Sequence, residues 1–339
     1  MGQLEGRRAT LEAVAARARV GRGTASRVIN GSDRVSAASR EAVLRAVREL
    51  GYVPNQAARA LVRRRTDTVA FVVAVEQERV FWEEPYFSAI VRGATAGLAD
   101  GGIQLLLAIA EPQQDRDRLT AFLKARHVDG VLLSSFRGDD PLPADIEQSG
   151  TPTVLVGRPT GYVPGWSVDV DNTEGARLAV RHLVERGRRR IATITGPLDI
   201  QAGVDRLAGF HDVLRESGLA PSAVANGNFT QASGVAAMQQ LLDQAPELDA
   251  VFAASDSMAA GALHALRQEG RQVPEDVAVV GFDDSPVAAE TDPPLTSVRQ
   301  PLEEMGRKMA RLMIARLNEG PEAENKLVLR PTLVVRKSS

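Results

Sequence analysis

The sequence predicts a multidomain protein, with a small all-α helix-turn-helix head followed by a two-lobed α/β core with parallel sheets. The chain has 339 residues, enough for two or three domains of about 150 residues each. Residues 1–60 show only short helical patterns, whereas apolar, β-branched runs alternate with amphipathic helices from Thr68 onward. The sign of the net charge changes at the same place. Residues 1–65 are basic, with fourteen Arg and five acidic residues, and the rest is acidic, with 27 basic and 38 acidic residues.

Three helices are expected in the head. The first begins after Thr10, which can cap it, and covers residues 11–18. The second covers residues 23–30, and the third begins at Ser36 and ends at Gly51. Because apolar residues recur on one face of each pattern, the helices can share one core. A short turn between the first two gives a compact bundle.

The core is expected to contain parallel sheets. Apolar runs that predict strands cover residues 69–75, 103–109, 128–134, 153–156, 191–195, 250–254 and 277–282. Helical patterns lie between them at residues 86–99, 115–126, 173–186, 204–216, 234–242, 258–268 and 302–318. Strands that are apolar on both faces and alternate with helices are typical of parallel sheets covered on both sides. About 270 residues is large for one sheet, so we expect two lobes, with a crossing near the Pro and Gly residues at 157–165.

Composition excludes several classes of site. The chain has no cysteine and four His, which excludes disulfides and thiol nucleophiles and leaves little for a metal centre. No run approaches the roughly 18 apolar residues of a membrane span, and the first residues form no apolar signal core, so we expect a cytoplasmic, nucleoid-associated protein. Phosphate-loop and nucleophile-elbow motifs are absent. We therefore expect no enzyme, and neither a metal nor a cofactor.

The basic head has the features of a DNA reader. A cationic segment attached to an acidic body is typical of a module that binds a polyanion. In the second helix, Arg22 and Arg27 can each bind O6 and N7 of guanine bidentately. Thr24, Ser26 and Asn30 carry short polar groups that suit phosphate contacts. An exposed arginine-rich helix without a ligand is the alternative interpretation.

An ordered series of residues carries a resemblance to a known family: Thr10, Val14-Ala15, 24–30, Val35-Ser36, Arg40, Leu50-Gly51-Tyr52, Pro54-Asn55 and 58–61. In this order and spacing they closely resemble the lactose-repressor (LacI/GalR) family of bacterial transcription regulators. Core motifs extend the resemblance over almost the whole chain: Asp171-Asn172, 206–210, 255–259 and 279–283.

The resemblance implies roles for head residues. It places base reading at Arg22, Gly23 and Arg27. Contacts to the DNA backbone are implied for Thr10, Thr24, Ser26, Asn30, Ser36, Tyr52 and Asn55. A hinge helix that inserts in the minor groove is implied at Ala58 and Leu61; for Leu61, a plain linker residue is the alternative.

The head departs from the family pattern at three positions. Ala13 stands where the family usually has Asp, and Gly21 replaces the usual capping Ser of the recognition helix. Arg19 stands where the turn usually has Gly or Asn. An Arg in a left-handed turn is less comfortable than Gly. We therefore expect that, if the backbone of the head departs from the family geometry, it does so at the turn between the first two helices.

The core is similar to the two-lobed periplasmic sugar-binding proteins, which implies an effector site between the lobes. Arg206 and Asp283 are implied to hold a small polar ligand, because a guanidinium fork and a carboxylate suit vicinal hydroxyls. A structural ion pair across the cleft is the alternative. Further expected effector contacts are Ser255, Tyr86, Phe87, Ser134 and Arg158.

Other core positions have a structural interpretation. Packing in the core is the alternative for the aromatic pair Tyr86 and Phe87. Gly175 and Gly196 are interpreted as positions of close packing or turns rather than as ligand contacts.

The resemblance also sets domain boundaries. We expect a DNA-binding domain over 1–54, a hinge helix and linker over 55–67, and an effector-binding core over 68–339. The first lobe is expected over about 68–168 and 299–325, and the second over about 169–298 and 326–339.

These features predict an allosteric repressor of the LacI family. As a homodimer it would bind a pseudo-palindromic operator in double-stranded DNA. A small polar effector, expected to be a sugar or sugar derivative, would control its affinity from the inter-lobe cleft. Two alternatives stay open: a free solute-binding receptor, and a family regulator controlled by a protein co-effector. No membrane partner is expected.

Overall fold

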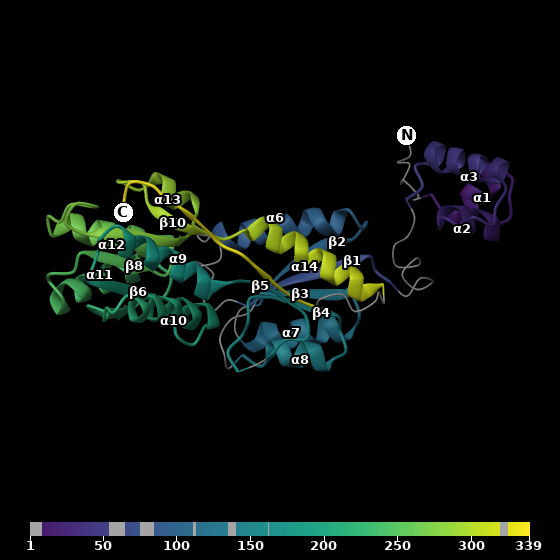
Figure 1. Ribbon diagram of the computed structural model, residues 1–339. Coiled ribbons are helices and arrows are strands. Elements are labelled where there is room, and N and C mark those ends of the chain that lie inside the picture. The colour runs from purple at the N-terminus through teal and green to yellow at the C-terminus, as the bar shows by residue number, and fades with distance from the viewer. Residues whose placement is uncertain are drawn as a thin grey trace, which may run out of the picture. The chain divides into compact units, whose positions relative to one another are not determined.

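The structure is a computed structural model that describes residues 9–53, 65–74, 85–110, 113–134, 140–161, 163–318 and 325–339. The chain divides into two compact units, Met1–Asp67 and Thr68–Ser339. Figure 1 shows the helices of the first unit and the two α/β lobes of the second.

The head consists of three helices: α1 (Leu11–Ala18), α2 (Arg22–Ile29) and α3 (Ala37–Leu50). The hydroxyl of Thr10 caps α1 by accepting a hydrogen bond from the Ala13 N–H at 3.2 Å. Ser36 caps α3 in the same way. One apolar cluster joins the three helices, with Val14, Val28 and Val43 buried at its centre. The predicted helices of the head are confirmed, with boundaries that differ by at most one residue.

The turn between α1 and α2 has the geometry expected from the unusual residues there. Arg19 lies in the left-handed region, at φ 54° and ψ 41°, and its N–H bonds to the Ala16 carbonyl. Gly21 begins α2 without a side-chain cap. The two helices therefore meet at the tight turn that a helix-turn-helix requires.

The first lobe is built on a six-stranded sheet whose strands are all parallel. In spatial order they are β11 (Lys326–Leu329), β5 (Ser167–Val170), β4 (Thr153–Val156), β3 (Gly130–Ser134), β1 (Thr68–Ala74) and β2 (Gln104–Ala110). Helices α6 (Pro85–Ala99) and α14 (Leu302–Leu317) pack together against one face, and α7 (Gln113–Lys124) and α8 (Leu142–Gln148) cover the other. Side chains of β1 alternate between the two faces, since Phe71 joins one apolar cluster and Val72 the other.

The second lobe repeats this arrangement around a second six-stranded sheet. Its strands, in order, are β12 (Thr332–Val334), β10 (Thr296–Arg299), β9 (Ala278–Asp283), β8 (Ala250–Ala253), β6 (Ile191–Thr195) and β7 (Val224–Asn226). Only β12, among these strands, runs antiparallel to its neighbour. One face carries α9 (Asn172–Glu185) and α10 (Gln201–Glu216), the other α11 (Gln231–Gln244) and α12 (Asp256–Gln268). A short helix, α13 (Pro286–Glu290), follows β9.

The first crossing between lobes does not lie at the Pro and Gly residues of 157–165, as their pattern predicted; the boundary implied by the resemblance, at about 168, is two residues before the observed end of β5. β4 and β5 pair in the same sheet, so the chain does not leave the first lobe at 157–165 but after Val170. It returns between β10 and α14, and crosses a third time between β11 and β12. Because β11 pairs with β5, residues 326–329 belong to the first lobe and not to the second. β5 was missed because its four residues, Ser-Val-Asp-Val, carry two polar side chains and form no apolar run.

No helix in the described part of the chain is long and apolar enough to cross a membrane.

Candidate functional site

The exposed face of α2 carries the residues predicted to read bases. Arg22, Gly23 and Arg27 are exposed, whereas Ala25 and Val28 on the opposite face are buried in the head core. The Arg22 side chain is 73 % exposed, and its Nε lies 3.0 Å from Oε1 of Glu12, which is exposed as well. The Arg27 Nε donates to the Gly23 carbonyl within the same helix at 3.2 Å. Such exposed contacts cost little to exchange for contacts with DNA.

The residues predicted to contact the DNA backbone occupy helix ends and the margins of α2. Thr10 and Ser36 cap α1 and α3, so their hydroxyls lie where helix N–H groups favour an anion. Asn30 donates to the Ser26 hydroxyl at 3.3 Å, and Thr24 is partly exposed beside them. Tyr52 packs against the head core. The predicted hinge residues Asn55, Ala58 and Leu61 lie outside the described residues.

In the core, Arg206 is the central charged group. It projects from α10, is 5 % exposed, and donates through Nε to the Asn172 Oδ1 at 2.9 Å and through Nη1 to the Ala254 carbonyl at 2.6 Å. Its guanidinium carbon lies 3.7 Å from the ring centroid of Phe282. Burial lowers the pKa of Arg206, and the charge of Asp283 opposes that shift.

Asp283, at the end of β9, is the partner of Arg206. Its Oδ1 lies 3.7 Å from the Arg206 Nη1 and accepts a hydrogen bond from the Gln300 Nε2 at 2.6 Å. Burial raises the pKa of Asp283 to about 6, although Arg206 and Gln300 act in the opposite direction. The backbone N–H at Asp256, the first residue of α12, also favours the charged form.

Two glycines allow aromatic rings to lie around the guanidinium. A Cβ atom on Gly175 would lie 2.7 Å from the Phe282 ring, and one on Gly196 would lie 2.4 Å from the Phe229 ring. The Phe229 centroid is 5.9 Å from the guanidinium carbon of Arg206. These distances support the interpretation of both glycines as close-packing positions. The rings that pack against these glycines, Phe282 and Phe229, both lie next to the Arg206 guanidinium.

Three of the residues predicted to contact the effector lie in the first lobe: Tyr86, Phe87 and Ser134. Tyr86 and Phe87 meet edge to face, with centroids 5.2 Å apart, and both pack against the apolar cluster under α6. Burial raises the pKa of Tyr86, and the charges of Asp169 and Asp283 raise it further, whereas the charge of Arg206 lowers it. Ser134, the last residue of β3, is fully buried, and its Oγ has no hydrogen-bond partner. The Ser134 hydroxyl is thus unpaired among the described residues, but Ser134 is not among the residues that line the pocket beside Tyr86 and Asp283.

Arg158 links the two lobes. Its Nε donates to the Asp169 Oδ2 of β5 at 2.8 Å, and its Nη2 donates to the Asp205 Oδ2 of α10 at 2.5 Å. Burial raises the pKa of Asp169, an effect that Arg158 opposes. The guanidinium predicted to touch an effector therefore holds two carboxylates, one from each lobe. We call Tyr86, Arg158, Asp169, Asp205, Arg206 and Asp283 the inter-lobe cluster.

A pocket of about 500 Å³ lies beside this cluster at the second crossing. Tyr86 and Asp283 line its wall, together with residues of the β9–α13 turn and the start of α14. Ser255, in contrast, caps α12 by accepting from the Met258 N–H at 3.3 Å, and is buried. The Ser255 hydroxyl therefore serves to cap the helix.

The inter-lobe cluster has the chemistry of a carbohydrate site. Carboxylates accept hydrogen bonds from hydroxyl groups, guanidinium groups donate to hydroxyl oxygens, and aromatic rings offer apolar faces. In the described part of the chain, no group of three His, Asp or Glu is arranged to hold a metal ion. The cluster draws on both lobes, so a ligand bound there would contact both.

Five residues of this region were given no role in the site from the sequence, although Asn172 was named as part of a family motif: Asp169, Asn172, Asp205, Phe229 and Gln300. Asp169 and Asn172 flank the end of β5, the strand that was not predicted. Asp205 directly precedes Arg206 on α10. A polar residue at the carboxyl end of a parallel strand is a signal that could have identified Asp169. Phe229 and Gln300 lie in connecting segments without such a signal.

The ion pair between Arg158 and Asp205 gives a testable expectation. Asp205→Asn removes the charge but keeps the shape of the side chain. The ion pair stabilises only this arrangement of the lobes, and Arg158 is 48 % exposed. We therefore expect the variant to lose about 0.5–1 kcal/mol of the free energy that favours this arrangement. A ligand that contacts both lobes should then bind roughly 2–5-fold more weakly in calorimetry. The matched control is Glu216→Gln, which breaks the Arg177 pair inside the second lobe. An equal effect of both variants would contradict the expectation.

Asp256, behind Asp283, gives a second expectation. It accepts from the Ser285 N–H at 2.7 Å and contacts the Ser297 hydroxyl at 2.5 Å. Burial, and then the charge of Asp283, raise the pKa of Asp256 to about 8. Between about pH 4 and pH 8 the folded chain therefore holds a proton that the unfolded chain releases, and stability falls as pH rises, by up to about 1.4 kcal/mol per unit.

Asp256→Asn imitates the protonated acid and should remove this dependence. We expect the free energy of unfolding of the variant, relative to the unsubstituted chain, to increase steadily from about pH 4 to pH 8 in urea titrations. A difference that does not vary with pH would show that Asp256 is ionised in the folded chain.

Two family models match the chain. "Bacterial regulatory proteins, lacI family" covers residues 10–55, the region of α1 to α3. "Periplasmic binding protein-like domain" covers residues 180–339.

Known proteins resemble the chain over nearly its whole length. The HTH-type transcriptional regulator CelR of Thermobifida fusca is 54 % identical over 337 residues, which is 98 % of both chains. The HTH-type transcriptional repressor CytR of Escherichia coli K12 is 33 % identical, over 98 % of this chain and 96 % of its own.

Solved structures agree with the observed fold. A CelR–cellobiose complex matches with a TM-score of 0.78 at 52 % identity, over 98 % of this chain and 100 % of the other. The lac repressor dimer bound to operator and the anti-inducer ONPF matches with a TM-score of 0.86 at 27 % identity, over 98 % and 99 %. This chain, with its helix-turn-helix head and its two-lobed core, belongs to the lacI family of bacterial regulatory proteins and is a DNA-binding transcriptional regulator.

Proposed function

We propose that this regulator is a repressor whose affinity for its operator is controlled by a disaccharide of the cellobiose class, bound at the inter-lobe cluster. The observation that carries the proposal is the buried contact between Arg206 and Asp283, beside a pocket that Asp283 lines together with Tyr86 of the other lobe. A relative of 52 % identity forms a complex with cellobiose, which supports this class of ligand.

The head supplies sequence recognition in this proposal. Arg22 and Arg27 would reach base edges in the major groove, and the capping hydroxyls at Thr10 and Ser36 would contact phosphates. Two heads of a homodimer would read the two halves of a pseudo-palindrome. The dimeric, operator-bound lac repressor supports this arrangement.

The core supplies control. A disaccharide that contacts both lobes favours the arrangement in which its partners lie together, and it can change DNA affinity only by its different affinities for the two arrangements. Coupling of this kind usually amounts to about 1–3 kcal/mol, or about 5–150-fold in affinity.

The test combines selection of DNA with a titration of sugars. Full-length protein is used to enrich duplexes from a randomised pool, and the affinity for the enriched duplex is then measured by fluorescence anisotropy with cellobiose, glucose or lactose. We expect a pseudo-palindromic sequence and an affinity that only cellobiose changes, by about 5-fold or more. Failure to enrich any sequence would overturn the role of the head, and an enriched duplex whose affinity is unaffected by cellobiose would overturn the effector assignment.

A further inference from the structure

The carboxylate of Asp283 is presented by an unusual turn. Asp283 and Asp284 follow each other at φ 114° and φ 52°, in the region of positive φ that favours glycine. Non-glycine residues persist there only when their surroundings hold them. Because Asp283 contacts Arg206 and Gln300, whatever holds this turn also sets the position of the effector-site carboxylate.

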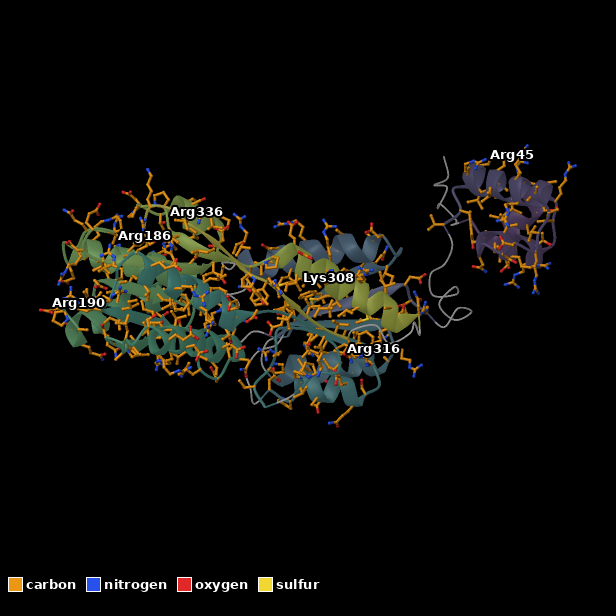
Figure 2. All side chains as sticks on the ribbon, viewed as in Figure 1. Arg45, Arg186, Arg190, Lys308, Arg316 and Arg336 are labelled. Carbon is orange, nitrogen blue, oxygen red and sulfur yellow. The ribbon has the colours of Figure 1, made fainter. Side chains whose placement is uncertain are left out.

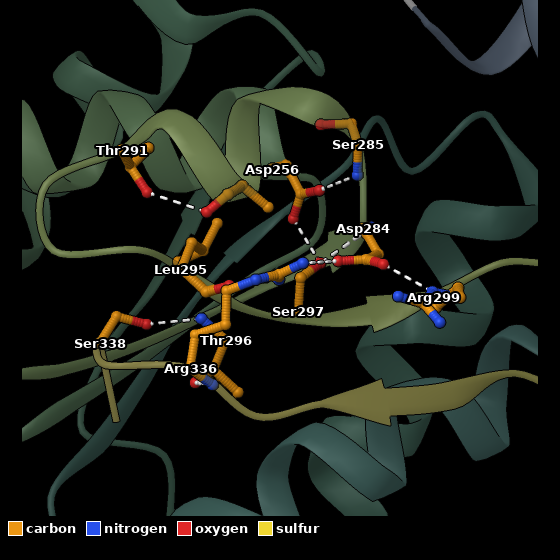
Figure 3. Close-up of polar contacts among 11 residues, drawn as sticks. Asp256, Asp284, Ser285, Thr291, Leu295, Thr296, Ser297, Arg299, Arg336 and Ser338 are labelled. Atoms are coloured by element: carbon orange, nitrogen blue, oxygen red, sulfur yellow. Dashed lines mark hydrogen bonds and ion pairs between the residues drawn. The ribbon is translucent and has the colours of Figure 1, made fainter.

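Asp284 is held by two arginines (Figure 3). Its carboxylate, 5 % exposed, lies 2.5 Å from the Arg336 Nη2 and 2.6 Å from the Arg299 Nε. Its N–H donates to the Ser297 hydroxyl at 3.0 Å. The side chain and the backbone of Asp284 are thus both fixed by residues other than Arg206.

Of the two arginines, Arg336 is the more rigidly placed. Its side chain is 21 % exposed, whereas that of Arg299 is 57 % exposed. The Arg336 Nη1 donates to the Leu295 carbonyl at 2.7 Å, and the backbone N–H of Arg336 donates to the Thr296 hydroxyl at 2.9 Å. Figure 2 labels Arg336 on the second lobe, in the region of β10 and α13.

Arg336 belongs to the segment that makes the third crossing. This segment pairs with β5 through β11 in the first lobe and with β10 through β12 in the second. After Arg336, the Lys337 N–H donates to the Pro294 carbonyl at 3.0 Å, and the Ser338 hydroxyl donates to the Val279 carbonyl at 2.6 Å. The guanidinium that holds Asp284 is therefore anchored on both sides along the chain.

We infer that Arg336 and Asp284 are positioning residues for the effector: their ion pair holds the Asp283–Asp284 turn and so aims the Asp283 carboxylate. The inference rests on the proposed function, because it assigns the pair to the same ligand site. Asp284 lines the pocket beside the inter-lobe cluster, whereas Arg336 does not. Arg336 reaches the site only through Asp284, which makes the two residues one functional unit.

The experiment is a double-mutant cycle on the full-length protein with cellobiose as the probe. We expect Arg336→Met and Asp284→Asn each to weaken cellobiose binding roughly 10-fold in calorimetry, and the double variant to be no weaker than the single ones. Arg336→Lys should recover part of the loss, because it restores the charge without the planar fork. The comparison variant, Arg299→Met, removes the exposed partner of Asp284, which also lines the pocket; it should change the affinity less than about 3-fold. A merely structural role would give additive losses and no recovery by lysine.

Hydrogen exchange in the ligand-free protein separates this inference from the proposed function. We expect Arg336→Met, but not Arg299→Met, to accelerate exchange of the Asp284 amide, with the amides of β8 unchanged. If the unsubstituted protein fails to bind cellobiose, the proposed function fails, and exchange alone still decides whether Arg336 holds the turn. Unchanged exchange at Asp284, or unchanged cellobiose affinity in Arg336→Met, would overturn the inference.

Discussion

Replacement of Arg206 by alanine should abolish the response of operator binding to cellobiose while leaving operator binding itself intact. The guanidinium is buried and joins Asn172, the Ala254 carbonyl and Asp283. Truncating one partner of a buried, hydrogen-bonded charge pair costs about 2–5 kcal/mol in binding, or roughly 30-fold or more. The head is a separate compact unit, so we expect operator binding in the absence of cellobiose to be unchanged.

Calorimetry with cellobiose and anisotropy with operator check this expectation. Arg206→Lys is the companion variant, since it keeps the charge but cannot make both directed hydrogen bonds; it should also bind cellobiose poorly. Arg181→Ala, on the exposed surface of α9, controls for the loss of one positive charge. Thermal unfolding shows whether each variant is folded. A folded Arg206→Ala protein that responds to ordinary cellobiose concentrations would contradict the assignment of this residue.

Replacement of Arg27 by alanine should have the largest effect on DNA recognition. Arg27 projects from the exposed side of α2, and its Nε contact within the helix leaves the fork available to a base. Loss of a bidentate contact with guanine costs about 1–3 kcal/mol of specific affinity. Binding to unrelated DNA should change much less, because it depends on total charge.

Arg45→Ala is the matched control for Arg27→Ala. Arg45 is also exposed in the head, on α3, and pairs with Glu41, so its loss removes the same charge without removing a predicted base contact. Both variants should lower the salt dependence of binding to a similar small extent. Only Arg27→Ala should reduce the ratio of specific to non-specific affinity. An equal loss of both affinities in Arg27→Ala would show that the residue contacts phosphate.

Most of the architecture could be predicted because the strands are long apolar runs between amphipathic helices. Val69 and Phe71 on one face of β1, and Ala70 and Val72 on the other, are buried by separate pairs of helices. That pattern is visible in sequence. β7 and β12, of three residues each, are too short to produce it, and their place depends on pairing with strands far along the chain.

The pattern of Pro and Gly residues alone could not locate the first crossing between lobes, because the strand that follows them is too short and polar to be recognised. Pro and Gly residues at 157–165 indicate a break in regular structure, and a break occurs there between β4 and β5. Whether the chain then changes lobe depends on the partner of β5, which is β4 on one side and β11 on the other. Residues 326–329 lie more than 150 positions away, and no local signal records such a pairing.

The site was predicted in part. Arg206 and Asp283 were assigned by resemblance, and the structure brings them together at 3.7 Å. Arg158 was also expected at the site, but its two partners lie on separate elements, Asp169 on β5 and Asp205 on α10. The pairing of charges across lobes is a property of the folded core, so a sequence pattern can name the groups without their partners.

The most direct test of the central claim is the cellobiose affinity of the full-length protein, measured once alone and once saturated with its operator duplex. If the sugar site and the DNA site are coupled, the two dissociation constants differ by about 5-fold or more, and operator affinity changes by the same factor when cellobiose is added, because coupling is reciprocal. Equal cellobiose affinities in the free and the operator-bound protein would contradict control of the head by the inter-lobe cluster.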